Sequence, residues 1–117
     1  MDVDLPDLML KKNSIVRNTE ELRSLLPELQ PDENSVPVML KSKHYYQVGC
    51  DIRQHQLLLD ILSSIFDPSA SKILWVADSS LAFLEPVEAD ELISAASAFA
   101  SGRLSNRCPE TGMMRVV

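Results

Sequence analysis

The chain has 117 residues, a length typical of a single domain with its own hydrophobic core. Hydrophobic residues make up 45% and charged residues 24% of the sequence, which excludes the composition of an intrinsically disordered chain. The formal net charge is −6 at pH 7, and residues 59–101 hold seven acids against the single base Lys72. Because such a surface repels phosphate backbones, we expect no direct nucleic-acid binding.

The compartment is indicated by the N-terminus and by the cysteines. The first ten residues contain three acids, whereas a secretory signal needs positive charge followed by a long apolar run. No apolar run approaches the roughly eighteen residues that suggest a membrane span. Two cysteines, Cys50 and Cys108, are typical of free thiols in a reducing compartment. The sequence therefore predicts a soluble cytoplasmic protein that binds no membrane.

The N-terminal third has few regular patterns. Residues 1–17 mix polar and apolar residues without a sustained period, which predicts a loosely held arm with room for a short strand. A short helix is predicted from Asn18, as its N-cap, to Pro27, and the following stretch has the composition of a loop. We therefore expect an N-terminal arm with a short helix over residues 1–35 and a core domain over residues 36–117.

After this loop, two short runs of alternating apolar residues predict a β-hairpin. A three-residue loop at residues 42–44 pairs Leu40 with Tyr46 and Val38 with Val48, which gathers apolar side chains on one face. A two-residue loop breaks this match, so we prefer the three-residue loop.

Residues 52–66 give the strongest helix prediction. Asp51 suits the N-cap, and the Asp67-Pro68 pair ends the helix. The residues of its apolar stripe recur at helical spacing. They are Leu58, Ile61, Leu62, Ile65 and Phe66.

A second hairpin is predicted in the next segment. Residues 72–77, Lys-Ile-Leu-Trp-Val-Ala, form a continuous apolar run that is typical of a buried strand. Residues 80–84 suit a second strand, with a turn at Asp78 and Ser79. A competing interpretation makes residues 78–84 a loop or a short helix.

A second main helix is expected from about Pro86 to Ser101, followed by Gly102 at the position after the helix end. Residues 94–101 are mostly Ala and Ser, and such small side chains let another helix approach closely. That helix can belong to the same chain or to a second copy, so a homodimer stays open. Residues 113–117 suit a last strand.

Together these elements predict an α+β fold. Its core is a two-layer, ββαββα-like domain with a mainly antiparallel sheet and two main helices, preceded by the N-terminal arm and its short helix.

Cys50 is the candidate reactive thiol. It lies just before the predicted helix cap Asp51, and a helix N-terminus favours the thiolate. The adjacent carboxylate opposes ionisation, and no second cysteine follows at Cys-x-x-Cys spacing. An ordinary packing role at a strand–helix junction is therefore the preferred interpretation.

Ligand sites have weak signals. His44, Cys50, His55 and Cys108 are acceptable zinc ligands in type, but their spacing does not match structural zinc sites, so we expect neither a metal nor a cofactor. The Asp78-Ser79-Ser80 stretch follows a predicted strand, where α/β folds bind ligands, although a surface turn is preferred.

With no catalytic motif in the chain, we predict a small acidic protein-binding module without catalytic activity. Adaptors, inhibitors, immunity-type proteins and accessory subunits are examples of this class. Another protein with a basic surface is the expected partner, and rim charges would govern the association rate. The alternative is a small cysteine-dependent enzyme or redox protein that uses Cys50. The candidate partner-binding residues are Glu85, Glu88, Asp90 and Glu91.

Overall fold

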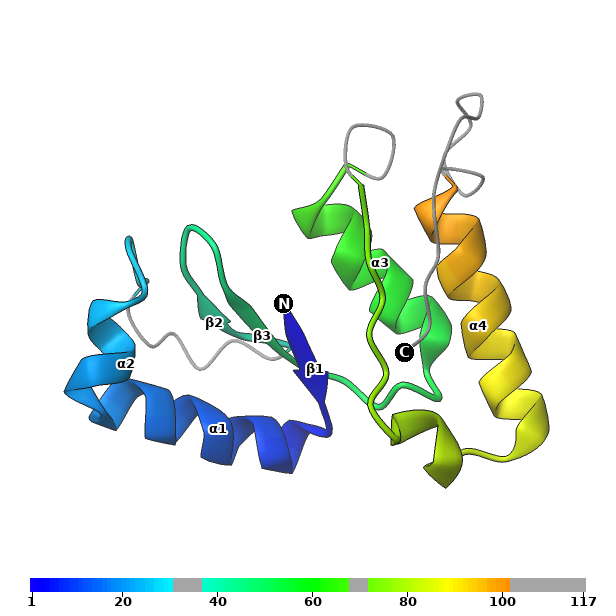
Figure 1. Ribbon diagram of the computed structural model, residues 1–117, viewed down its shortest axis with the longest axis horizontal. Helices are drawn as coiled ribbons and strands as arrows, with labels where there is room; N and C mark the ends of the chain where they lie inside the picture. Colours follow the sequence, from blue (N-terminus) through cyan, green and yellow to red (C-terminus); the bar gives the residue numbers. More distant parts are fainter. Residues whose placement is uncertain (31–36, 68–71, 102–117) are drawn as a thin grey trace. The chain divides into compact units, whose positions relative to one another are not determined.

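The structure is a computed structural model that describes residues 1–30, 37–67 and 72–101 (Figure 1). It divides into two compact units, Met1–Ile52 (unit 1) and Arg53–Val117 (unit 2). The described residues form one mixed sheet of three strands and four α-helices, so the predicted α+β class is confirmed at that level.

Unit 1 contains the sheet, in the strand order β1-β3-β2. The central strand β3 (Tyr46–Gly49) pairs in parallel with β1 (Asp2–Asp4) and antiparallel with β2 (Val38–Lys41). The prediction of a mainly antiparallel sheet is wrong, because the expected arm supplies a strand that runs parallel to β3. The boundary at residue 35, as a division between separately folding parts, stays a prediction.

The β2-β3 hairpin is confirmed, but its register is only partly as predicted. Val38 pairs with Val48 as expected, whereas Leu40 pairs with Gln47 because the register shifts between Val38 and Leu40. One residue, Met39, is thus extra on β2, which is the arrangement of a β-bulge. The bulge explains why alternation along the two strands did not predict the pairing nearer the turn.

The turn of this hairpin is tighter than predicted. The Ser42 N–H donates to the carbonyl oxygen of Tyr45 at 2.9 Å, which leaves Lys43 and His44 at the tip. The Ser42 hydroxyl donates to the same carbonyl and accepts from the Tyr45 N–H, both at 3.1 Å. The three-residue loop is therefore wrong, and the residue that it would have supplied appears as the bulge in β2.

Helix α1 (Pro6–Asn18) occupies the segment that was expected to be a loose arm. Proline at its first position suits a helix start, because its missing N–H would have no partner there. Only Met9 and Asn13 are buried on α1, so the helix lacks the apolar stripe that a sequence pattern would reveal. The predicted short helix exists as α2 (Glu20–Ser24), but Thr19 takes the N-cap position.

Asn13 connects α1 to the bulge. Its Nδ2 donates to the carbonyl oxygen of Met39 at 2.9 Å, and its Oδ1 accepts from Nε of Arg17 at 2.8 Å. The Arg17 Nη1 donates in turn to the carbonyl oxygen of Gln30 at 3.1 Å. A buried amide at 5% exposure thus satisfies a carbonyl in the bulged segment.

Unit 2 contains the two predicted main helices. Helix α3 (His55–Ile65) packs against α4 (Pro86–Ala100), and both predictions are confirmed. However, α3 begins at His55 with Gln54 at the N-cap position, so the prediction of Asp51 as the cap is wrong. The buried apolar residues of this unit come from both helices. They are Leu58, Leu59, Ile61, Leu62, Ala96, Phe99 and Ala100.

The predicted second hairpin does not form. Residues 72–77 take part in no strand pairing within the described part of the chain, and Figure 1 draws them as an elongated trace. Residues Ser80–Phe83 form a short 3-10 helix, η1, which agrees with the competing interpretation of this segment. Apolar runs of this length are compatible with either structure, so periodicity alone could not separate them.

The predicted strand at residues 113–117 lies outside the described residues. Among the residues that the structure does describe, no helix is long and apolar enough to cross a membrane.

Candidate functional site

Polar residues in unit 1 follow the carboxyl ends of the two parallel strands. Strand β1 ends at Asp4 and β3 ends at Gly49, and these two residues are paired in the register. The Cys50 N–H continues the pairing by donating to the carbonyl oxygen of Asp4 at 2.9 Å. Carboxyl ends of parallel strands are the edge at which α/β sheets bind ligands, so Asp4, Cys50 and Asp51 form the first candidate site.

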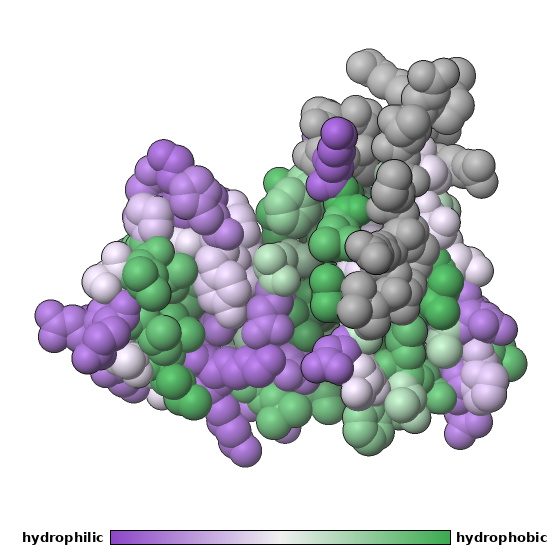
Figure 2. Space-filling view, viewed as in Figure 1, coloured by the Kyte–Doolittle hydropathy of each residue, from purple (hydrophilic) through white to green (hydrophobic). Residues whose placement is uncertain are grey.

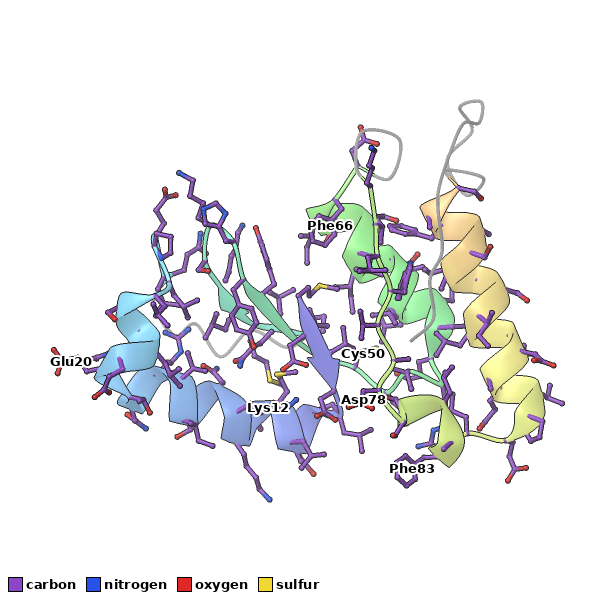
Figure 3. The ribbon with its side chains drawn as sticks, viewed as in Figure 1. Lys12, Glu20, Cys50, Phe66, Asp78 and Phe83 are labelled. Carbon is purple, nitrogen blue, oxygen red and sulfur yellow. The ribbon has the colours of Figure 1, made fainter. Side chains whose placement is uncertain are left out.

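An ion-pair cluster lies next to this edge. Lys12 Nζ lies 3.1 Å from Oδ2 of Asp2 and 2.9 Å from Oδ2 of Asp4, and Figure 3 labels Lys12 on α1. The Lys12 hydrogen bond is the main cause that lowers the pKa of Asp4, and the Asp4 hydrogen bond is the main cause that raises the pKa of Lys12. Asp2 and Asp4 are two residues apart on a strand and therefore share a face. The Asp-Val-Asp alternation was the sequence signal for this cluster, but the sequence analysis did not predict Asp2 and Asp4 as site residues.

Gln47 extends the cluster into the interior. Its side chain is 1% exposed, and its Nε2 donates to Oη of Tyr45 at 3.3 Å. The Tyr45 hydroxyl donates to Oδ2 of Asp2 at 3.5 Å, so the chain of contacts returns to the ion pair. The Gln47 Oε1 is buried and has no hydrogen-bond partner among the residues that the structure describes.

Cys50 is packed rather than presented to solvent. The residue is 2% exposed, and Sγ donates to the carbonyl oxygen of Asp51 at 3.5 Å. Burial is the main cause that raises the pKa of the Cys50 thiol, and the Asp51 charge adds to it. A raised pKa lowers the thiolate population at neutral pH and disfavours nucleophilic chemistry. Its assignment as a reactive thiol stays a prediction.

The second candidate site lies in unit 2, directly after the elongated trace. Asp78, Ser79 and Ser80 are all exposed, and Figure 3 labels Asp78 where η1 begins. Ser79 has φ of 59°, a left-handed conformation that costs energy for a residue with a Cβ. Its hydroxyl lies 3.4 Å from Oδ1 of Asp78, and the Ser80 hydroxyl donates to the Asp78 carbonyl oxygen at 3.3 Å. The predicted turn thus presents a carboxylate and two hydroxyls at the surface.

The four predicted partner-binding acids lie at the start of α4. Glu88 is half-buried, and its Oε2 accepts a hydrogen bond from the Glu85 backbone N–H at 3.0 Å, which completes a capping box. Glu85, Asp90 and Glu91 are exposed. Glu88 therefore has a structural role in starting the helix, and the binding role of the set stays a prediction.

Within the described residues, the candidate metal ligands are not brought together. The described residues contain no group of three or more His, Cys, Asp or Glu side chains suited to a metal ion. Cys108, the fourth member of the weighed zinc set, lies outside those residues.

Comparison with protein families decides what kind of protein these units belong to. The family model for leucine carboxyl methyltransferase matches residues 1–97, which spans both units and both candidate sites. The chain belongs to the leucine carboxyl methyltransferase family.

Curated relatives of this methyltransferase-family chain share one name. The chain is 38% identical over 99 residues to a tRNA wybutosine-synthesizing protein 4 of Gibberella zeae, a match that covers 83% of this chain and 10% of the relative. The protein of that name from Eremothecium gossypii is 33% identical over 106 residues, covering 91% of this chain and 14% of the relative. The human protein is 31% identical over 93 residues, covering 80% and 14%.

The matched stretch is thus a small part of each relative, since this chain spans 10% to 14% of their length. No solved structure gives a significant match.

Family membership corrects the functional prediction. The prediction of a protein-binding module without catalytic activity is wrong, because the family is one of methyltransferases and its model spans residues 1–97. The adaptor and regulatory roles that followed from it are wrong for the same reason. The alternative, a cysteine-dependent enzyme or redox protein, is contradicted as well, since it names another class of enzyme.

Proposed function

We propose that this chain forms part of a leucine carboxyl methyltransferase-type domain that takes part in tRNA wybutosine synthesis. The observation that carries the proposal is the family match over residues 1–97, together with relatives of 31% to 38% identity that bear the name tRNA wybutosine-synthesizing protein 4. The rest of the domain would come from polypeptide outside the matched stretch, because that stretch is 10% to 14% of those relatives.

In this proposal, the turn at Asp78, Ser79 and Ser80 contributes to binding the methyl donor. A methyltransferase needs an activated methyl group, which S-adenosylmethionine supplies from its sulfonium. The exposed Asp78 carboxylate suits the ribose hydroxyls of such a donor, since a carboxylate accepts hydrogen bonds from hydroxyl groups. The left-handed Ser79 supports this role, because strained backbone tends to occur at functional positions.

The tRNA would be bound elsewhere in the assembled enzyme. Residues 59–101 carry seven acids and one base, a balance that repels a phosphate backbone. We therefore keep the proposal that this chain makes no direct nucleic-acid contact and that its partner is protein. The exposed Glu85, Asp90 and Glu91 offer such a partner a negative rim that would speed association at low salt. The free thiol of Cys50 is the feature that supports the cytoplasm as the proposed compartment.

A reconstituted methyl-transfer assay tests the function. The Gibberella zeae relative is expressed without the stretch that matches this chain, a protein that we call the gapped relative. The two are combined with labelled S-adenosylmethionine and tRNA from cells that lack the relative. We expect label in the tRNA only when both proteins are present. A folded complex that labels no tRNA would refute the proposal, as would label that enters a peptide ending in leucine instead.

Asp78→Asn tests the proposed donor contact within that assay. We expect a KM for S-adenosylmethionine raised about tenfold, because one hydrogen bond to a charged acceptor is weakened. Asp60→Asn is the matched control, since Asp60 is also an exposed carboxylate with one side-chain partner, Gln56 Nε2 at 3.0 Å. Equal KM values for the two variants would remove Asp78 from the donor site.

A further inference from the structure

The elongated segment of residues 72–77 has two different faces. Ile73, Trp75 and Ala77 are half-buried, whereas Lys72, Leu74 and Val76 are exposed. The Trp75 ring meets the Phe99 ring of α4 edge-on, with centroids 6.4 Å apart and an interplanar angle of 84°. This alternation is that of a β-strand covered on one face only.

The uncovered face is apolar. Leu74 is 64% exposed and Val76 is 65% exposed. Apolar residues also reach the surface close by in the sequence, where Phe83 is 88% and Val87 is 68% exposed, and Figure 3 shows the Phe83 ring pointing away from η1. Figure 2 shows hydrophobic residues at the visible surface of unit 2. Exposed apolar groups in a strand-like segment indicate a surface that is buried in an assembly.

The backbone hydrogen bonding of this segment is the next relevant feature. Within the described residues, none of the backbone groups of residues 72–77 takes part in a hydrogen bond. The Trp75 Nε1 is buried and likewise has no hydrogen-bond partner in the described part of the chain. An extended segment with unpaired N–H and C=O groups is a template for the addition of a strand, in which main-chain bonds give affinity and side-chain contacts give specificity.

We infer that residues 72–77 are a sheet strand that pairs with a β-strand from the remainder of a methyltransferase domain, and that the same partner buries Leu74 and Val76. The family match runs through this segment, and most of each relative's polypeptide lies outside the matched stretch, which makes up only 10% to 14% of it. Apolar side chains on both faces of a strand are typical of a sheet whose two faces are both covered. This inference rests on the proposed function, but it concerns assembly and is tested without catalysis.

Binding of the gapped relative to this chain is the test. The chain has a single tryptophan, so fluorotryptophan incorporated into it gives one fluorine NMR signal, from Trp75, whatever tryptophans the partner contains. We expect a one-to-one complex on gel filtration with light scattering, a shifted Trp75 signal, and slowed amide exchange at Leu74 and Val76.

Single lysine substitutions locate the contact. Leu74→Lys and Val76→Lys should each weaken binding about tenfold or more, because each places a charge where an apolar side chain would be buried. Ile15→Lys on α1 is the matched control, since Ile15 is 60% exposed and should leave binding unchanged. Circular dichroism confirms that each variant is folded.

Every other result of the binding experiments overturns the inference. Absence of a complex, or a complex that is insensitive to Leu74→Lys and Val76→Lys, removes these residues as the contact. A dimer of this chain alone that the same substitutions dissociate assigns the surface to a second copy. A complex that forms as expected but transfers no methyl group refutes the proposed function and leaves the strand pairing in place.

Discussion

The substitution Asn13→Ala tests how unit 1 is held together. It removes the amide that donates to the Met39 carbonyl at 2.9 Å and accepts from Arg17 at 2.8 Å. Asn13 is 5% exposed and Met39 is 4% exposed, so the substitution leaves a buried carbonyl of the bulged segment without that donor. The bulge itself is what makes this carbonyl depend on a side chain, since an extra residue is left out of the strand ladder.

The expected loss of stability is about 1.5 to 3.5 kcal/mol. A buried polar group left unsatisfied costs about 1 to 3 kcal/mol, and the partly exposed hydrogen bond to Arg17 adds about 0.5 kcal/mol. Against a typical unfolding free energy of about 5 to 15 kcal/mol, this is a large fraction. Asn13→Asp should cost a similar amount at pH 7, because it keeps a partner for Arg17 but faces the Met39 carbonyl with a second acceptor.

Urea unfolding followed by tyrosine absorbance measures this loss in the right unit. Both tyrosines of the chain, Tyr45 and Tyr46, lie in unit 1, whereas the only tryptophan lies in unit 2. Asn18→Ala is the matched control on the same helix, because Asn18 is exposed and, within the described residues, its side chain bonds only to Ser14 Oγ at 3.1 Å. Its loss should therefore stay within about 0.5 kcal/mol. If Asn13→Asp proved as stable as the wild type, the Met39 carbonyl bond would contribute nothing and the reasoning would fail.

Three further predictions concern the same unit and its strand end. Gly49→Ala should lower the unfolding free energy by about 1 to 2 kcal/mol in urea, since the new Cβ would lie 2.5 Å from Cε of Met39 and 3.1 Å from the Pro6 backbone. An equal cost in a Met39→Ala background would contradict a clash with the methionine. Because the pKa of Asp4 is lowered from 3.8, its stabilisation is present above that pH and is lost as the pH falls through the lower folded value. Asp4→Asn should therefore flatten the dependence of the unfolding free energy on pH at acidic pH. The change should be less than about 1 kcal/mol because the Lys12–Asp4 ion pair is partly exposed, and an unchanged dependence would contradict a stabilising role for this pair. Iodoacetamide should label Cys50 more slowly at pH 7 than a free-cysteine peptide, because burial raises the pKa of this thiol from 9.0. The measurement uses a variant whose other cysteine is serine, and a faster rate would support the reactive-thiol prediction instead.

The elements that sequence reasoning placed correctly are those whose signal is local. Helix α4 begins at Pro86, as the proline indicates, and buries Ala96, Phe99 and Ala100. Helix α3 follows its apolar period in the same way. The start of α3 was misplaced because Asp51 and Gln54 look like a capping pair, although the helix starts three residues after the expected first position, at His55.

The errors concern structure that depends on distant partners. Helix α1 has no apolar stripe, and it is held by Asn13 on the Met39 carbonyl and by Lys12 on the acids of β1, contacts that join residues 8 to 26 positions apart. The strand β1 is only three residues long and becomes visible only once β3 is placed beside it. The hairpin register failed for a similar reason, since no residue type announces the bulge at Met39.

The functional error has a chemical cause. We treated the lack of a nucleophile, a metal set and a catalytic triad as evidence for a binding module, and those absences exclude only enzymes that need such groups. In a methyltransferase that uses a sulfonium donor, the methyl group is already activated, so such an enzyme mainly binds the donor and acceptor and orients them. Carboxylates and hydroxyls can bind such molecules, and in a sequence a set such as Asp78 and Ser80 looks like an ordinary surface turn. For this class of enzyme, the informative signal is the pattern over residues 1–97 as a whole, and no single cluster such as the one around Cys50 carries it.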